Sequence, residues 1–182
     1  VREISYFYKK IELMRKIGIA FIVALCMASC VSTQTDGRRA GERREMQQRV
    51  YDGIDSRHFK IEFDYVLPHS MPARYPTTTY SLSVNGDSID SYLPYFGVAY
   101  RSKFPDDMQS PLIFQGHATG FSISQYKKDG RRITFNVKNG DELLGYDPIV
   151  FDNGRASLNV QSSDREGIDF SGNVSMPASV RK

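Results

Sequence analysis

From Phe59 onward, apolar and polar side chains alternate along most of the chain, and glycine-containing turns separate the alternating segments. Successive side chains of a β-strand point to opposite faces, so a period of two predicts half-buried antiparallel strands. Asn85-Gly86 gives the clearest turn signal, because both central residues of a type I′ hairpin turn need a positive φ. Further turns are predicted at residues 116–120, 129–130, 139–140 and 153–154.

This alternation predicts about eight or nine short strands. They cover residues 59–65, 80–85, 88–93, 112–114, 121–126, 133–137, 142–151, 156–160 and 168–172. Pro148 cannot donate a hydrogen bond to a ladder, so we expect an edge strand or a bulge there. An antiparallel meander must protect its edges. The predicted fold class is therefore all-β: a small closed barrel, or alternatively a β-sandwich, over residues 57–176, followed by a tail at 177–182.

One amphipathic helix is predicted before the strands, over residues 36–56. Met46, Val50 and Ile54 recur every four residues and form a narrow apolar stripe, while arginine and glutamate occupy most other positions. Such a helix packs on a core through its last two turns. An alternative is that its arginine-rich first half lies on anionic lipid headgroups.

Residues 14–30 have the layout of a secretory signal peptide. Arg15 and Lys16 precede an apolar run of about eleven residues, and Ala28 and Ser29 precede Cys30. The segment resembles the bacterial lipoprotein type, in which this cysteine takes the lipid, such as palmitate, and becomes the first mature residue. An uncleaved membrane helix is disfavoured, because a span needs ~20 apolar residues. We expect residues 1–13 to be an over-called upstream segment, 14–29 the signal and 30–35 a polar tether.

The basic character of the chain lies in the segment that we expect to be removed. The chain has 24 Lys/Arg and 21 Asp/Glu, and residues 1–29 hold five and two of them, which leaves 19 of each. A neutral domain gives no electrostatic evidence for nucleic-acid binding. With Cys26 removed and Cys30 acylated, no pair of thiols remains to form a disulfide.

The sequence offers no set of residues that predicts a catalytic, metal or cofactor site. His58, His69 and His117 lie at a strand start, in a loop and in a turn, without the spacing of a metal site. The segment around Ser122 lacks the last glycine of a nucleophile elbow. The acidic candidates for glycoside hydrolysis all fall in turns, where aspartate is common for backbone reasons: Asp106-Asp107, Asp141-Glu142 and Asp152.

Residues 92–100 contain a dense group of aromatic side chains. The candidates for a ligand surface are Tyr92, Tyr95, Phe96 and Tyr100. They could line a pocket or stack on a sugar, or they could fill the core where a strand leaves the sheet. Alternate positions of a strand point to opposite faces, so we do not expect all four in one site.

Several short segments carry a resemblance to a known family. They are Gly86-Asp87, residues 92–97 (YLPYFG), Ala99-Tyr100, 114–116 (FQG), 133–138 (ITFNVK), 150–154 (VFDNG) with Ala156, Leu158 and Val160, and 168–172 (IDFSG). Through them, residues 43–175 resemble a lipoprotein family of Bacteroides-type bacteria, the domain of unknown function 4251 family. The resemblance implies an exported, lipid-anchored β-domain without an assigned activity. Residues 145–148 depart from it, because relatives have an uninterrupted strand there.

Three functional hypotheses follow. The first is a non-enzymatic envelope lipoprotein that binds a small ligand or a partner protein. Val31 rather than aspartate follows Cys30, which favours the outer membrane. No acidic run follows at 32–35, which favours the periplasmic face of that membrane over the cell surface. The second is a hydrolase acting on envelope glycan or lipid, and the third is a structural or assembly component of the envelope.

The anchor hypothesis predicts the fate of a Cys30→Ser variant. Without the thiol that takes the lipid, the protein should move from the membrane to the soluble fraction, which fractionation and immunoblotting measure. Mass spectrometry of the wild type should find an acylated Cys30 at the mature N-terminus. Persistent membrane association of the variant would show that the signal assignment is wrong.

Overall fold

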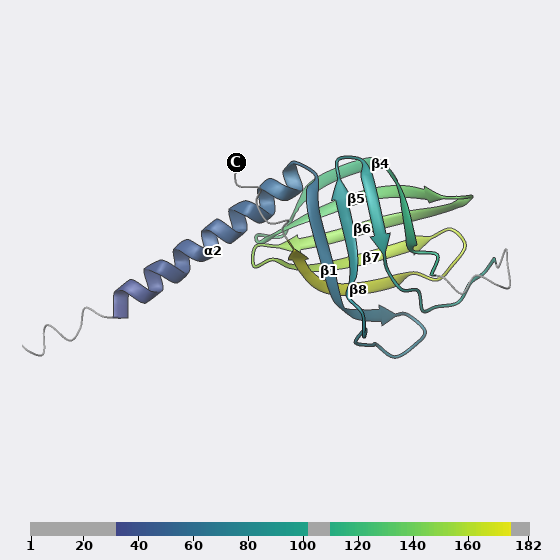
Figure 1. The fold of residues 1–182 in the computed structure, drawn as a ribbon, viewed down its shortest axis with the longest axis horizontal. Coiled ribbons are helices and arrows are strands. Elements are labelled where there is room, and N and C mark those ends of the chain that lie inside the picture. Colours follow the sequence, from purple (N-terminus) through teal and green to yellow (C-terminus); the bar gives the residue numbers. More distant parts are fainter. Residues whose placement is uncertain (1–31, 102–109, 176–182) are drawn as a thin grey trace, which may run out of the picture. The chain divides into compact units, whose positions relative to one another are not determined.

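The computed structural model describes residues 32–101 and 110–175 (Figure 1). The signal segment, Cys30, Asp106-Asp107 and the tail after 175 lie outside the described residues. The chain divides into two compact units, residues 1–44 and 45–182. Within the described residues, no helix combines the length and the apolar character that a membrane span requires.

Within the described residues, one helix precedes eight strands. They are α2 (Ser32–Asp55), β1 (His58–Pro68), β2 (Tyr80–Asn85), β3 (Ser88–Tyr92), β4 (Ile113–Tyr126), β5 (Gly130–Asn139), β6 (Glu142–Phe151), β7 (Arg155–Ser162) and β8 (Ile168–Ser175). Each strand runs antiparallel to the next, and β8 pairs with β1 over residues 168–175. The predicted closed barrel is thus confirmed, with eight strands, and the sandwich alternative is wrong because the first and last strands share one ladder.

Inward-pointing side chains fill the barrel. Residues of β6 alternate between buried and partly exposed along the whole strand, as a closed sheet requires. The largest buried side chains include Tyr146, Phe63, Phe135 and Phe170. The Phe135 ring stacks on that of Tyr146 at 5.2 Å and on that of Phe121 at 5.4 Å. The interior is therefore a packed core.

The last turns of α2 close one end of this barrel. Val50 and Ile54 are fully buried in the core, as the apolar stripe predicted. Asp152, in the turn after β6, accepts hydrogen bonds from the Tyr51 hydroxyl and, at 2.7 Å, from the Gln47 side chain. The helix begins at Ser32, four residues before the predicted start and inside the expected tether. Residues 32–35 are polar and carry no apolar stripe, so the periodicity could not extend the predicted helix over them.

The turn predicted at residues 116–120 is wrong, because β4 runs through it as one strand. Residues 113–117 of β4 pair with β3, and residues 118–126 pair with β5. The register with β5 shifts between Thr119 and Ser122, and Gly120 has a φ of +65°. Glycines within a strand mark bulges and barrel corners as well as turns. Here they bend β4 so that it passes from one neighbour to the other.

The prediction of an edge or a bulge at Pro148 is also wrong. Pro148 lies in the middle of β6, between β5 and β7, and pairs with Leu158 of β7. On the β5 side, the pairs that flank it are Arg132↔Ile149 and Phe135↔Tyr146, which share one register. The missing donor thus interrupts the β5 ladder locally without moving the strands.

The contact of β1 with β8 makes a stability prediction at Gly172. A Cβ there would lie 2.0 Å from the Glu62 carbonyl oxygen and 2.7 Å from the Phe63 Cα, both backbone atoms. Gly172→Ala should therefore push the two strands apart and lower the free energy of unfolding by about 3 kcal/mol or more.

Gly145→Ala is the matched control, because its Cβ would meet nothing closer than the Asn136 Oδ1 at 3.4 Å. Urea denaturation of both variants measures the difference. Equal stability of the two would contradict this account of barrel closure.

Candidate functional site

We call the end of the barrel away from the last turns of α2 the distal end. There β1 and β3 end and β4 and β6 begin. Four connections reach it: residues 69–79, the described residues 93–101 and 110–112, the turn at 140–141, and residues 163–167. Loops at one end of a rigid scaffold are common places for binding residues. The distal end also carries the predicted aromatic candidates.

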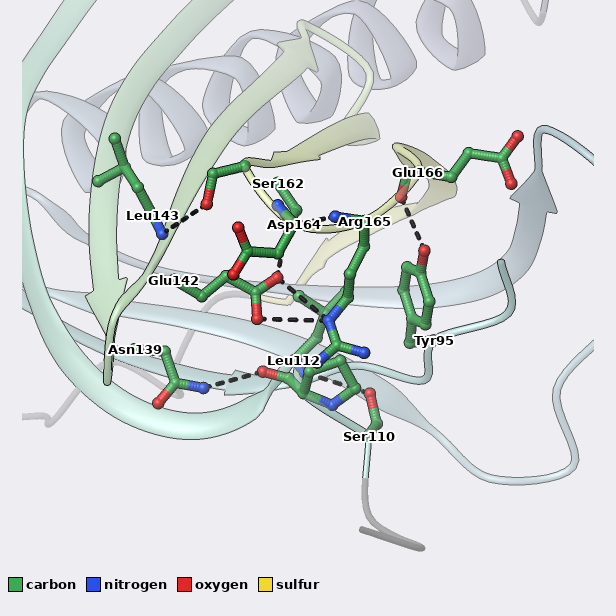
Figure 2. A network of polar contacts seen from close by, with 12 residues as sticks. Tyr95, Ser110, Leu112, Asn139, Glu142, Leu143, Ser162, Asp164, Arg165 and Glu166 are labelled. Atoms are coloured by element: carbon green, nitrogen blue, oxygen red, sulfur yellow. Dashed lines mark hydrogen bonds and ion pairs between the residues drawn. The ribbon is translucent and has the colours of Figure 1, made fainter. Parts of the chain in front are cut away.

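A buried carboxylate organises this end. Glu142 occupies an inward-facing position at the start of β6, with only 11% of its side chain exposed. It accepts hydrogen bonds from the Ser162 hydroxyl and from Arg165 Nε, the latter at 3.2 and 3.3 Å (Figure 2). A buried carboxylate is costly unless it is paired and hydrogen-bonded. The cation and the hydroxyl meet this requirement and fix the β7–β8 connection to the start of β6.

That connection in turn holds the segment after β3. The Ser162 hydroxyl oxygen accepts hydrogen bonds from the backbone N–H of Asp164 and Arg165, at 2.9 and 3.1 Å. The Asp164 carbonyl accepts one from the Tyr100 N–H at 2.8 Å, and the Val98 carbonyl accepts one from the Glu166 N–H at 2.9 Å. Residues 98–101 are thus held against residues 164–166 by main-chain bonds.

Tyr95 anchors the same segment from within. Its hydroxyl donates to the Val98 carbonyl oxygen at 3.1 Å and to the Glu166 carbonyl oxygen at 3.0 Å, and Figure 2 shows the second of these bonds. The Arg165 guanidinium lies 5.7 Å from its ring centroid. Burial, which disfavours the phenolate, raises the pKa of Tyr95 to about 12. Tyr95 therefore positions the loop as a neutral donor.

The other predicted aromatic residues divide between the two roles that the sequence left open. Phe96 is half-buried, and the Arg74 guanidinium lies 4.8 Å from its ring centroid. Tyr92 and Tyr100 are 42% and 68% exposed. Tyr95 and Phe96 thus pack within the loop, whereas Tyr92 and Tyr100 face outward.

Exposed apolar side chains gather at the distal end. Of the eight large hydrophobic residues that are exposed in the described part of the chain, seven lie there, and the eighth is Met46 of α2. We call the seven the distal rim: Leu67, Met71, Tyr75, Tyr92, Val98, Tyr100 and Leu143. The sequence prediction named Tyr92 and Tyr100 and missed the other five. For Met71 and Tyr75, the available signal was their position in a proline-rich loop that cannot bury them in a strand.

The chemical candidates are separated in space. His69 Nε2 lies 3.1 Å from the Asp169 carboxylate, and His58 Nδ1 lies 2.6 Å from the Ser56 carbonyl. Asp152 holds α2 and Glu142 holds Arg165. Over residues 32–101 and 110–175, no group of three or more histidine, cysteine or acidic residues is placed to hold a metal ion.

The fold and its distal end define a small, filled, closed antiparallel β-barrel with an apolar rim. A family model described as a domain of unknown function (DUF4251) matches residues 42–174. This match covers most of the chain, which therefore belongs to the DUF4251 family, as its short segments predicted.

A solved structure has the same fold. It is the crystal structure of a DUF4251 family protein from Bacteroides eggerthii DSM 20697, with 14% sequence identity and a TM-score of 0.53. The similarity covers 72% of this chain and 87% of that chain. Among curated proteins, the comparison finds no match.

The raised pKa of Tyr95 predicts how stability changes in alkali. Because the pKa in the folded protein, about 12, lies above the ordinary value of 10.0, the neutral phenol contributes its full stabilisation below pH 10. That contribution is lost as the pH rises through about 12. Tyr95→Phe should be less stable by about 1 kcal/mol at pH 8, since two carbonyls lose a donor. The variant has no phenol at position 95 to ionise, so its free energy of unfolding should fall less than that of the wild type between pH 10 and 12.

Urea denaturation from pH 8 to 12 measures both effects. Tyr100→Phe is the control, because the exposed Tyr100 should leave the stability curve unchanged. An unaltered pH dependence in Tyr95→Phe would contradict the anchoring role.

Proposed function

We propose that this protein is a non-enzymatic envelope lipoprotein, anchored through a lipid on Cys30, that binds a partner protein through its distal rim. Its expected place is the periplasmic face of the outer membrane, with the cell surface as the alternative. The observation that carries the binding role is the gathering of seven exposed apolar residues at one end of the barrel. Exposed apolar groups gathered on a soluble domain are typical of interaction sites.

The filled interior favours binding at the outside of the barrel. Barrels that hold a small ligand leave room inside. Here Tyr146, Phe135 and Phe170 occupy the core and are at most 2% exposed. A partner protein on the rim is therefore a better fit than a small molecule inside the barrel.

The rim residues are also well suited to recognition. Tyr75 and Tyr100 are 81% and 68% exposed, and tyrosine is frequent among the residues that contribute most to binding. The main-chain bonds to residues 164–166 hold Val98 and Tyr100 in place. A loop that is ordered before binding loses less conformational entropy on association.

The geometry favours the other two hypotheses less directly. The carboxylates Glu142 and Asp152, which a hydrolase could use, each serve a structural contact instead. An assembly component of the envelope would also have a filled barrel, and its partner would then belong to a larger complex. The identity of the captured partner distinguishes an assembly component from a lipoprotein that binds a single partner protein.

Crosslinking and pull-down of the lipoprotein from its own envelope test the rim. The triple variant Tyr75→Ser/Val98→Ser/Tyr100→Ser should lose at least tenfold of the captured partner, because the apolar contact area is removed. Met46→Ser is the matched control, since Met46 is exposed and apolar but lies on α2. Equal capture by wild type and the triple variant would refute binding at the rim.

A further inference from the structure

A polar hollow of about 460 Å³ lies on the outer face of β2, β3 and β4. Its walls are two rows of outward-facing side chains that the strand register places side by side. The rows are Ser83, Asp90 and Gln115, and Asn85, Ser88 and His117. The volume is within the usual range of small-molecule sites.

The sequence explains why the surface is hollow here. Ile89 and Gly116 pair across β3 and β4 between the two rows, and both line the hollow. Ile89 points inward and is buried, and a side chain at Gly116 would also point inward, against the buried Val137, so backbone alone forms the floor between the rows. Ser83 and Ser88 are short, so the taller Gln115 and His117 stand at the side of a depression. The shape thus follows from residue sizes on rigid strands.

The lining has the chemistry of a site for hydroxyl groups. Serine hydroxyls and the amides of Asn85 and Gln115 each donate and accept hydrogen bonds. Within the described residues, these six side chains form one hydrogen bond with each other, from Gln115 Nε2 to Asp90 Oδ2 in the first row, and it is long at 3.5 Å. Most of these donors and acceptors are thus available to a ligand.

Charge excludes other classes of ligand. No lysine or arginine lines the hollow, and Asp90 would repel an anion. One carboxylate is too few for a divalent cation, which takes several oxygen ligands. Ser88, Asp90 and His117 share this face, yet in the described part of the chain no hydrogen bond joins His117 to either of the others, so a catalytic triad is not formed.

An aromatic ring stands beside the hollow. Tyr92 is the next outward-facing residue of β3 after Asp90, and its ring lies 5.7 Å from that of Tyr80. The flat face of an exposed aromatic side chain can pack on the C–H groups of a sugar ring, while neighbouring polar groups bind its hydroxyls.

We propose that this hollow binds a neutral carbohydrate, with Asp90 and Gln115 as its main hydrogen-bonding residues and Tyr92 as a stacking surface. The hollow lies outside the three rim residues that the triple variant changes, although Tyr92 belongs to both surfaces, and it does not depend on the lipid anchor. It gives the protein a second, polar recognition surface.

Saturation-transfer difference NMR of the purified protein in a sugar-free zwitterionic detergent tests the proposal. The probes are maltotriose, cellotriose, laminaritriose, mannotriose and N,N′,N″-triacetylchitotriose, all of them neutral. At least one should bind saturably with a Kd on the order of 1 mM. Asp90→Ala and Gln115→Ala should each raise the Kd for this sugar about tenfold. Tyr92→Ala should reduce the saturation transferred to the protons of the sugar ring.

Gln125→Ala is the matched control, because Gln125 is also an exposed glutamine of β4 but lies outside the hollow. It should bind as wild type does, and circular dichroism should show the same β-structure in all variants. The proposal is overturned if none of the five probes shows binding at a concentration of about 10 mM, ten times the expected Kd. It is also overturned if Gln125→Ala weakens binding as much as Gln115→Ala, or if inorganic phosphate displaces the sugar.

Discussion

The ladder between β1 and β8 is the interaction on which the rest of this structure depends. It joins the first strand to the last. A meander has two open edges, and this pairing closes both of them to form a barrel. The ladder shifts register between Phe63 and Tyr65, and Gly172 faces this point with no side chain, against the backbone of Glu62. Closure therefore requires a residue without a Cβ at one position of β8. Once the barrel is closed, its two ends are the places where the core must be sealed from water.

The two ends are sealed by different chemistry. At one end, Val50 and Ile54 of α2 are fully buried, and burial of each contributes about 1.5–3 kcal/mol. At the distal end, the ion pair of Glu142 and Arg165 closes the barrel. Desolvation offsets much of the Coulombic attraction of such a pair, so its main effect is to fix where the β7–β8 connection lies. That position determines the main-chain bonds to residues 98–101 and, through them, the exposed side chains of the rim.

The sequence predicted the features that depend on local periodicity. The alternation of side chains, the Asn85-Gly86 turn and the stripe of Val50 and Ile54 all indicated the elements that form. The glycines at 116–120 and Pro148 were misinterpreted, because the same residue type marks a turn, a bend or a bulge according to its neighbours in space. The ion pair was not predictable, since Glu142 and Arg165 are 23 positions apart and Glu142 follows a turn. The contact of Tyr51 with Asp152 spans 101 positions, which no local pattern reveals.

The shortness of β3 connects several of these features. β3 has five residues and β4 has fourteen, so the pairing of β4 with β3 ends at His117, and the Ala118 N–H bonds to the Asp87 carbonyl just before β3. Beyond that point, in the part of the chain that the structure describes, β4 has a neighbour only on its β5 side. Exposed strand edges invite pairing with other chains, and lysine commonly prevents it. Lys127 and Lys128 stand at the end of this edge, so charge protects it where pairing does not. The polar hollow lies where β3 is still present, which gives its side chains a rigid base on both sides.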